Sequence, residues 1–301
     1  MALVGFNLRH IEAFLAVVDL GTFRRAAERL NTSQPNISNR ISQLERFIGN
    51  RILDRDAGSV RLTPKGQALV APAREILAAV DGFLSAAGDE ALFEGVLRLG
   101  VSEMVAHTWL RPFMVEMKAR FPGIDVELTV DLSASLSKAL LARDLDLTFQ
   151  SGPFEQPARC TVLLGQSGYV WVAAPNLGIG ADLLTANEFA NHAILTHSRG
   201  TVPQKQLDAH LRSISHEMRL VSASNIGTCL HMALDGLGIA CLPEDMIGEP
   251  LADGRLQRLT YGWQPDDLSF AARYVVEPEP PYLSEAVKIA QKLYPAQDNK
   301  S

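Results

Sequence analysis

Residues 22 to 45 carry two short apolar patterns with helical spacing on either side of a polar turn. Thr22 is placed to cap the first helix, whose apolar face consists of Phe23, Ala26, Ala27 and Leu30. The turn consists of Asn31, Thr32 and Ser33. A second helix follows with Pro35 in its first turn, where a missing N–H removes no intrahelical hydrogen bond. Two short helices joined in this way predict a helix-turn-helix.

The second helix of this pair has a polar outer face. Its inward positions are Ile37, Ile41 and Leu44. Its outward side chains are rich in amide and guanidinium donors, which pair with base edges in the major groove of DNA. The predicted DNA-contacting residues are Ser33, Gln34, Pro35, Asn36, Ser38, Asn39, Arg40 and Gln43. The alternative is a surface helical hairpin with an ordinary solvated face.

The flanking sequence favours the DNA-binding interpretation. Upstream, an apolar stripe provides a helix on which the pair packs, made of Leu8, Ile11, Leu15 and Val18. Downstream, residues 50 to 63 predict two short strands about an Asp-Ala-Gly-Ser turn, with Arg55 and Arg61 near the strand ends as further DNA contacts. Three helices and a β-wing predict a winged helix-turn-helix domain over residues 1 to 63.

Positive charge is concentrated in this N-terminal unit. Residues 1 to 66 hold ten Lys and Arg against six Asp and Glu, whereas the whole chain has a formal net charge of −6. Cationic groups gathered on one module release counterions from DNA whatever the total charge of the protein. The candidate phosphate contacts are Arg24, Arg25, Arg29, Arg51, Arg55, Arg61 and Lys65, and the alternative for each is a solvated surface charge.

Several blocks occur here in the order and spacing of one known family: Ala-Ala-Glu-Arg-Leu, Ser-Gln-Pro, Ile-Ser, Gln-Leu-Glu and Leu-Thr-Pro-Lys-Gly. Residues 8 to 66 therefore resemble the DNA-binding domain of the LysR-type transcriptional regulators. The run Ala233 to Pro243 is similar to the family's signature in the second lobe of its C-terminal part. Asn39 stands where many members carry Arg or Gln, so the resemblance implies no particular base preference. Ile52-Leu53 replaces the common Leu-Phe, an apolar exchange that should preserve the fold.

Residues 64 to 92 predict one long helix, capped by Thr63 and with Pro64 at its first position. Its apolar seam consists of Leu69, Ile76, Leu77, Val80, Phe83 and Leu84, and Pro72 bends the helix without ending the seam. A second copy of the chain is the economical way to bury this seam, and packing on the chain's own second domain is the alternative. In the family this is the dimerisation helix, so the resemblance implies a homodimer or homotetramer.

Strand-like and helical stretches alternate from residue 96 onward, which predicts α/β units over a mainly parallel sheet. The strand-like runs are 96–101, 124–130, 145–150, 160–164, 168–174, 193–196, 217–221, 238–242 and 269–276. The pattern allows one sheet or two. The resemblance implies an effector-binding domain over residues 93 to 301 with two lobes like a periplasmic binding protein. Lobe I then covers about 93 to 166 and 268 to 301, and lobe II about 167 to 267.

Polar residues lie where several predicted strands end and helices begin, and the N–H groups of helix N-termini favour an anion. The predicted effector-binding residues are Ser102, Glu103, Gln150, His197, Arg199, Thr201, Ser224 and Asn225. Arg199 is the cation among them and suits a carboxylate, sulfonate or phosphate. A solvated loop arginine and simple helix capping by the hydroxyl residues are the alternatives. We therefore expect a small anionic effector.

Other chemistry is not indicated. Cys160, Cys229 and Cys241 lack C-x-x-C spacing, so we expect structural thiols in a reduced cytoplasm. A redox-sensing cysteine is the alternative, because some members of the family sense peroxide. The histidines show no metal-ligand spacing and Gly236-x-Gly238 lacks a third glycine, so we expect no metal and no cofactor. A missing signal peptide and membrane span predict a cytoplasmic protein with no membrane partner.

Three functions follow for comparison. The first is a ligand-responsive, sequence-specific transcriptional regulator whose partners are operator DNA, a small-molecule effector, further copies of itself and RNA polymerase. The second is a solute-binding protein, which the basic N-terminal unit and the missing signal peptide disfavour. The third is an α/β enzyme, disfavoured because no nucleophile, base and orienting group emerge from the motifs. The sequence favours the regulator and predicts no catalytic residue.

Overall fold

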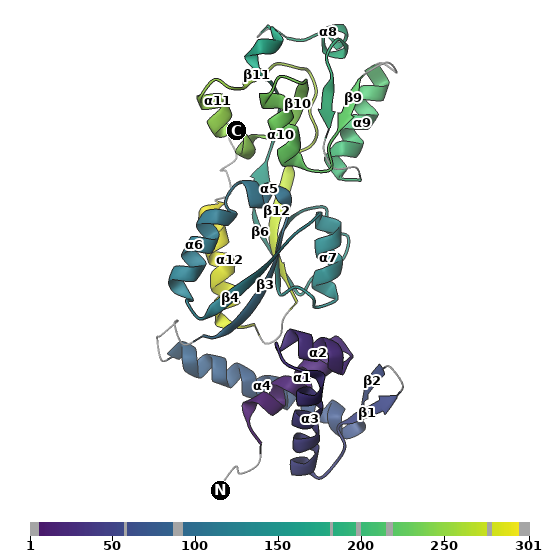
Figure 1. Cartoon of the computed structure of the whole chain (residues 1–301), viewed down its shortest axis with the longest axis vertical. Helices are drawn as coiled ribbons and strands as arrows, with labels where there is room; N and C mark the ends of the chain where they lie inside the picture. The colour runs from purple at the N-terminus through teal and green to yellow at the C-terminus, as the bar shows by residue number, and fades with distance from the viewer. Residues whose placement is uncertain are drawn as a thin grey trace.

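We describe the protein from a computed structural model that covers residues 6–56, 59–86, 93–180, 183–196, 200–214, 219–275 and 279–294. Three parts follow one another along the long axis of the molecule (Figure 1). The N-terminal part, which we call the head, lies at one end, lobe I lies beside it, and lobe II lies at the other end.

The head comprises α1 (Leu8–Leu20), α2 (Phe23–Arg29), α3 (Gln34–Ile48) and the wing strands β1 (Leu53–Asp56) and β2 (Ser59–Leu62). Phe14, Ile37 and Ile41 are fully buried in its core. The side chain of Thr22 caps α2 and that of Ser33 caps α3, each accepting a backbone N–H. The predicted winged helix-turn-helix is confirmed.

Helix α4 (Pro64–Ala86) leads out of the head with Pro72 inside it, and it contacts α1 and the C-terminal helix of lobe I. The predicted long helix is confirmed over these residues, and residues 87–92 lie outside the described part of the chain. Its seam is covered only in part in the single chain, since Leu69 and Leu77 pack against the core of the head, whereas Ile76 is 40% and Phe83 is 74% exposed. Neither α4 nor any other described helix is long and apolar enough to cross a membrane.

The described strands of lobe I form a mixed sheet in the order β4-β3-β5-β12-β6. They are β3 (Gly95–Val101), β4 (Ile124–Val130), β5 (Leu147–Ser151), β6 (Cys160–Ser167) and β12 (Leu268–Tyr274). β3 pairs in parallel with β4 and β5, whereas β12 runs antiparallel to β5 and β6. The helices are α5 (Glu103–His107), α6 (Leu110–Arg120), α7 (Ser133–Leu141) and α12 (Pro281–Leu293). α6 and α12 lie on one side of the sheet and α7 on the other (Figure 1).

The described strands of lobe II form a second sheet in the order β11-β7-β10-β8-β9. They are β7 (Tyr169–Ala173), β8 (Ile194–Thr196), β9 (Leu220–Ser222), β10 (Ile239–Pro243) and β11 (Gln257–Leu259). The helices are η2 (Pro175–Leu177), α8 (Ala186–Ala190), α9 (Val202–Ile214), α10 (Ile226–Leu234), η3 (Glu244–Met246) and α11 (Gly248–Ala252). The sequence pattern predicted these strands except β11.

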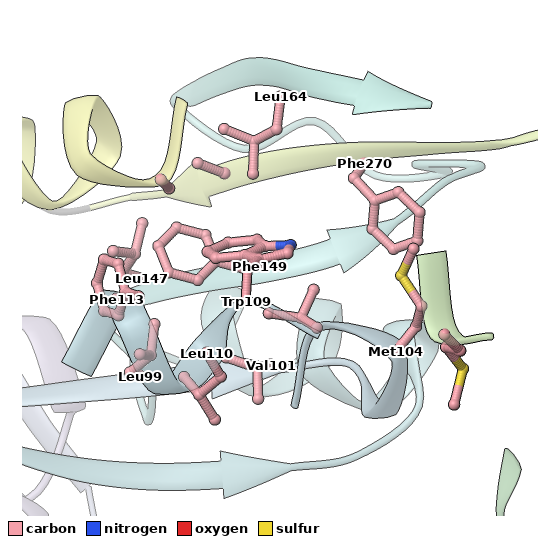
Figure 2. Packing of buried hydrophobic residues seen from close by; sticks show 14 of the residues in the cluster. Leu99, Val101, Met104, Trp109, Leu110, Phe113, Leu147, Phe149, Leu164 and Phe270 are labelled. Carbon is pink, nitrogen blue, oxygen red and sulfur yellow. The ribbon is translucent and has the colours of Figure 1, made fainter. Parts of the chain in front are cut away.

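The chain passes between the lobes twice. Gly168 alone separates the end of β6 in lobe I from the start of β7 in lobe II, and the chain returns to lobe I with β12. The open question of one sheet or two is therefore answered by two. Trp109 and Phe149 pack against each other in the core of lobe I, with ring centroids 4.9 Å apart and ring planes tilted by 53° (Figure 2). The same hydrophobic cluster includes Ile226 and Cys229 of lobe II, so the lobes share a core at their junction.

Candidate functional site

Helix α3 presents a polar outer face to solvent. The exposed residues at this surface are Ser33, Gln34, Pro35, Asn36 and Asn39, whereas Ser38 and Arg40 are half-buried. The Asn36 amide donates to Thr32 Oγ1 at 3.1 Å within the preceding turn. Amide and guanidinium groups on such a helix match the donors and acceptors of base edges. The face is chemically suited to a major groove.

Gln43 is held against α1. Its Oε1 lies 2.8 Å from Nε2 of His10, a residue that is 6% exposed. His10 Nδ1 accepts the backbone N–H of Asn7 at 3.0 Å, so the ring proton lies on Nε2 and donates to Gln43. Gln43 therefore fixes α3 on α1, in addition to any contact that it makes with DNA.

The wing is tied to the end of α3 by one carboxylate. Glu45 Oε1 accepts the backbone N–H of Ile52 at 2.9 Å and that of Leu53 at 3.3 Å. Hydrogen bonds to an ionised acceptor are stronger than neutral ones, so this contact fixes the wing relative to α3. Arg61 is exposed on β2, and the side chain of Arg55 lies outside the described part of the structure.

Two arginines that were candidates for phosphate contact face lobe I instead. Arg25 pairs with Asp144, and Arg29 pairs with Asp146. Burial, and then the charge of Arg29, lowers the pKa of the neighbouring Arg98 of lobe I. Arg24, by contrast, is exposed and pairs with Glu28 on its own helix at 2.9 Å. Helix α2 therefore seats the head on lobe I.

A cavity of about 280 Å³ lies between the two lobes. Its walls carry the hydroxyls of Ser102, Ser133, Ser137, Ser151 and Thr201. The charged side chains at the walls are Lys138, Lys205, Glu103, Asp131 and Glu155, and the apolar ones include Met104, Leu132, Ile226 and Phe270. The first residues of α7 and α9 also line it, so the N–H groups that begin both helices favour an anion there.

Two serine hydroxyls at the cavity wall are free to donate. Ser102 is 8% exposed, and its Oγ has no hydrogen-bond partner among the described residues. Ser137 Oγ accepts from Gln150 Nε2 at 2.7 Å and from Arg273 Nη1 at 3.0 Å, which uses both of its lone pairs. Buried polar groups are normally hydrogen-bonded, and an oxygen of a ligand would supply the acceptor that both protons lack.

Glu103 joins the lobes beside this cavity. Its carboxylate accepts Asn225 Nδ2 at 2.6 Å and the backbone N–H of Ile226 at 3.0 Å, both from lobe II. Gly227 lets the two helices approach, because a Cβ at that position would lie 2.5 Å from His107 Nε2. The N-terminus of α10 is therefore occupied by a carboxylate of the protein, and those of α7 and α9 are left to a ligand.

The structure brings part of the predicted effector set to one place. Ser102, Glu103 and Thr201 line the cavity, whereas Gln150, Ser224 and Asn225 are not among the described lining residues. Gln150 is 1% exposed behind Ser137. His197 and Arg199 lie outside the described residues, so their assignment stays a prediction.

The sequence did not predict several residues that line the cavity: Ser133, Ser137, Lys138 and Lys205. Ser133 and Ser137 stand four residues apart, which puts them on one face of a helix that begins just after a strand. That spacing was the available signal. The two lysines reach the cavity from different lobes, and no local pattern shows that.

Two of the three cysteines, Cys229 and Cys241, are poorly suited to redox chemistry. Cys229 and Cys241 are buried, which raises the pKa of Cys229 to about 11 and also raises the pKa of Cys241. The thiolate is the reactive form, so both thiols are unreactive near neutral pH. Within the described ranges, no group of His, Cys, Asp and Glu side chains could hold a metal ion.

Family models match both halves of this architecture. Residues 8–67 match the bacterial regulatory helix-turn-helix protein, lysR family, and residues 90–290 match the LysR substrate binding domain. The chain belongs to the LysR family of transcriptional regulators. The family resemblance, the fold class and the interpretation as a LysR-type DNA-binding regulator with an effector-binding domain are thereby confirmed.

Relatives of this LysR-type regulator match it over most of its length. The HTH-type transcriptional regulator GltR of Bacillus subtilis (strain 168) is 24% identical over 282 residues, which are 93% of each chain. A probable hydrogen peroxide-inducible genes activator of Streptomyces viridosporus is 30% identical over 255 residues, covering 83% of this chain and 82% of the relative. The crystal structure of ArgP from Mycobacterium tuberculosis shares the fold, with a TM-score of 0.61 and 22% identity over 96% of this chain and 98% of that one.

Proposed function

We propose that a small anionic effector bound between the lobes controls this LysR-type regulator. The unpartnered Ser102 hydroxyl at the wall of the cavity of about 280 Å³ is the observation that carries the proposal. A buried hydroxyl without a partner is uncommon, and a ligand oxygen would satisfy it. Lys138, Lys205 and the N-termini of α7 and α9 add positive potential around the same space.

Each group at the wall has a distinct role in this proposal. Ser102, Ser137 and Thr201 donate to oxygens of the ligand, and the two lysines balance its charge. The apolar part of the ligand contacts Met104, Ile226 and Phe270. Asp131 and Glu155 limit the negative charge that the cavity accepts, which favours a monocarboxylic acid over a polyanion.

The head is proposed to read operator DNA through the outer face of α3 and the wing. Exposed Ile76 and Phe83 on α4 suit a second copy of the chain, so we propose a homodimer or homotetramer whose paired heads read a pseudo-palindromic site. RNA polymerase would then meet the regulator on the promoter.

A thermal-shift screen of the full chain tests the effector site. Small carboxylic acids are compared with their uncharged carboxamides, and a ligand at one hundred times its Kd stabilises the folded state by about 2.7 kcal/mol. Acids should raise the melting temperature and amides should not. Ser102→Trp should abolish the shift and keep DNA binding at low salt, whereas Thr228→Trp, on the exposed side of α10, should retain both. An equal response to acids and amides would contradict an anionic effector.

A peroxide-responsive regulator is the second candidate, because the Streptomyces viridosporus relative carries that description. The burial of Cys229 and Cys241 argues against it. A peroxide response of DNA binding that is lost in Cys160→Ser, Cys229→Ser or Cys241→Ser would establish it. Unchanged DNA binding in peroxide would exclude it.

A further inference from the structure

The contact between the head and lobe I is built around Arg25 and Arg29. Arg25 Nη2 donates to the carbonyl oxygen of Ala142 at 2.8 Å and pairs with Asp144. Arg29 pairs with Asp146, whose side chain is 4% exposed. The second pair is therefore the shielded one, and water screens it less than an exposed ion pair.

Arg98 of lobe I also contacts Asp146 and the backbone of Arg29. Its backbone N–H donates to Asp146 Oδ2 at 2.9 Å, and its Nη2 donates to the carbonyl oxygen of Arg29 at 3.0 Å. Side chain and backbone of Arg29 are thus both held. We call Arg98, Ala142, Asp144 and Asp146, together with Arg143, the head seat.

Arg143 extends the head seat to α1 and α4. Asp19, near the end of α1, lies 3.4 Å from Arg143 Nη1 and 2.7 Å from Arg74 Nη2 of α4. Arg143 has a φ of 60°, in the left-handed region that costs a non-glycine residue about 1 to 2 kcal/mol. A strained arginine that bridges to another domain is kept there by its contacts.

Helix α7 and strand β5 run between this seat and the cavity. The first turn of α7 lines the cavity, and the residues that follow its last turn form the seat. Strand β5 begins directly after Asp146 and ends at Ser151, which lines the cavity. At that end Ser133 Oγ lies 3.0 Å from Ser151 Oγ and accepts the Ser151 N–H at 3.1 Å.

We propose that α7 and β5 form a relay through which the state of the cavity sets the position of the head. The proposal rests on the cavity being the effector site. A ligand that moves the first turn of α7 also moves the head seat, because one helix of nine residues connects them. The seat holds α1 and α2 and leaves the outer face of α3 exposed, so the relay changes where α3 points rather than covering it.

Amide hydrogen exchange of the full chain, without effector, tests the relay. Ser133→Ala breaks the contact with Ser151 at the cavity end of α7, the full length of that helix away from the head seat. Ser222→Ala is the matched control, since it breaks a similar hydroxyl pair with Thr196 at 2.9 Å in lobe II. Exchange is followed in α2, with α9 as the reference for global stability.

Ser133→Ala should speed exchange in α2 by about twofold or more, the lower range for coupled residues in one network. Ser222→Ala should leave α2 unchanged. Asp146→Asn should itself speed exchange in α2, and Ser133→Ala should add nothing further in that background. Ser151→Ala removes the hydroxyl part of this contact and keeps the backbone N–H that donates to Ser133 Oγ, so it should speed exchange in α2 by less; it replaces Ser133→Ala if that variant does not fold.

Unchanged exchange in α2 on Ser133→Ala, or full additivity with Asp146→Asn, would overturn the relay. Neither result depends on a ligand, so failure of the relay is distinct from failure of the effector site. If carboxylic acids give no thermal shift while Ser133→Ala still speeds exchange in α2, the coupling between the cavity and the head is supported and the anionic effector is contradicted.

Discussion

Glu103 should hold the two lobes together, and Glu103→Ala should lower the free energy of unfolding by about 3 kcal/mol. The carboxylate accepts two hydrogen bonds from lobe II, from Asn225 Nδ2 and from the backbone N–H of Ile226. A hydrogen bond to a charged group contributes about 1.5 to 3 kcal/mol. Because Glu103 is half-buried, the lower value applies to each bond.

Glu103→Gln removes the charge of the carboxylate and keeps the shape of the side chain, so it separates their contributions to the free energy of unfolding. The amide oxygen can still accept one N–H, so the loss should fall to about 1 to 1.5 kcal/mol. Urea unfolding of the full chain measures both variants through the fluorescence of Trp109 in lobe I and Trp171 in lobe II. In Glu103→Ala the lobes should also unfold less cooperatively, because a contact between them is lost.

Glu155→Ala is the control for Glu103, since it removes an exposed carboxylate from the wall of the same cavity. Its effect should stay within about 0.5 kcal/mol. If Glu103→Ala changes the free energy of unfolding by no more than Glu155→Ala does, Glu103 does not hold the lobes together. Equal losses for Glu103→Ala and Glu103→Gln would show that the carboxylate charge dominates rather than the geometry of the acceptor.

Further predictions concern DNA binding, assembly and thiol chemistry. Gln34→Ala should weaken binding to an operator isolated by selection by about 1 to 3 kcal/mol at unchanged stability. Gln43→Ala should weaken the same binding and also lower stability by about 1 kcal/mol, because it leaves a histidine N–H unpaired. Fluorescence anisotropy measures the DNA binding of both variants, and calorimetry measures their stability. Phe83→Ser should shift sedimentation equilibrium toward the monomer, and an unchanged oligomer would exclude α4 as the interface. Alkylation of Cys229 should be slow near pH 8 and accelerate about tenfold per pH unit up to its pKa of about 11, because only the thiolate reacts; fast reaction near pH 8 would contradict its burial.

Local pattern predicted most of the strands, but the mainly parallel sheet that it also predicted is wrong, because β12 runs antiparallel to β5 and β6, and β7 runs antiparallel to β10 and β11. The run 124–130 coincides with β4, and the run 238–242 lies one residue from β10 (Ile239–Pro243). Such runs are apolar and bounded by turn residues, so burial on the sheet determines their composition. The strand Gln257–Leu259 was missed because Leu259 is its single apolar residue, whereas the equally short β8 (Ile194–Thr196) lies in an apolar run.

The sequence predicted lining residues of the cavity only where they lie at the ends of helices or strands. Ser102 and Thr201 stand at boundaries that the sequence reveals, and both line the cavity. Arg29 and Asp146 pair across 117 positions of the chain, and such a contact depends on how the head packs on lobe I. The sequence placed Arg29 among the candidate phosphate contacts because both a phosphate and a carboxylate satisfy a guanidinium.

The chain crossing at Gly168 places a hinge between the two lobes. Leu268, where β12 re-enters lobe I, pairs with Ser167 beside that glycine, so both connections lie at one point. β12 then extends to Tyr274, about 20 Å away at the rise of a strand. Tyr274 pairs with Leu147, the neighbour of Asp146 on which the head rests. Tilting the lobes by about 10° would displace the head by about 3.5 Å, close to the rise of one base pair along DNA.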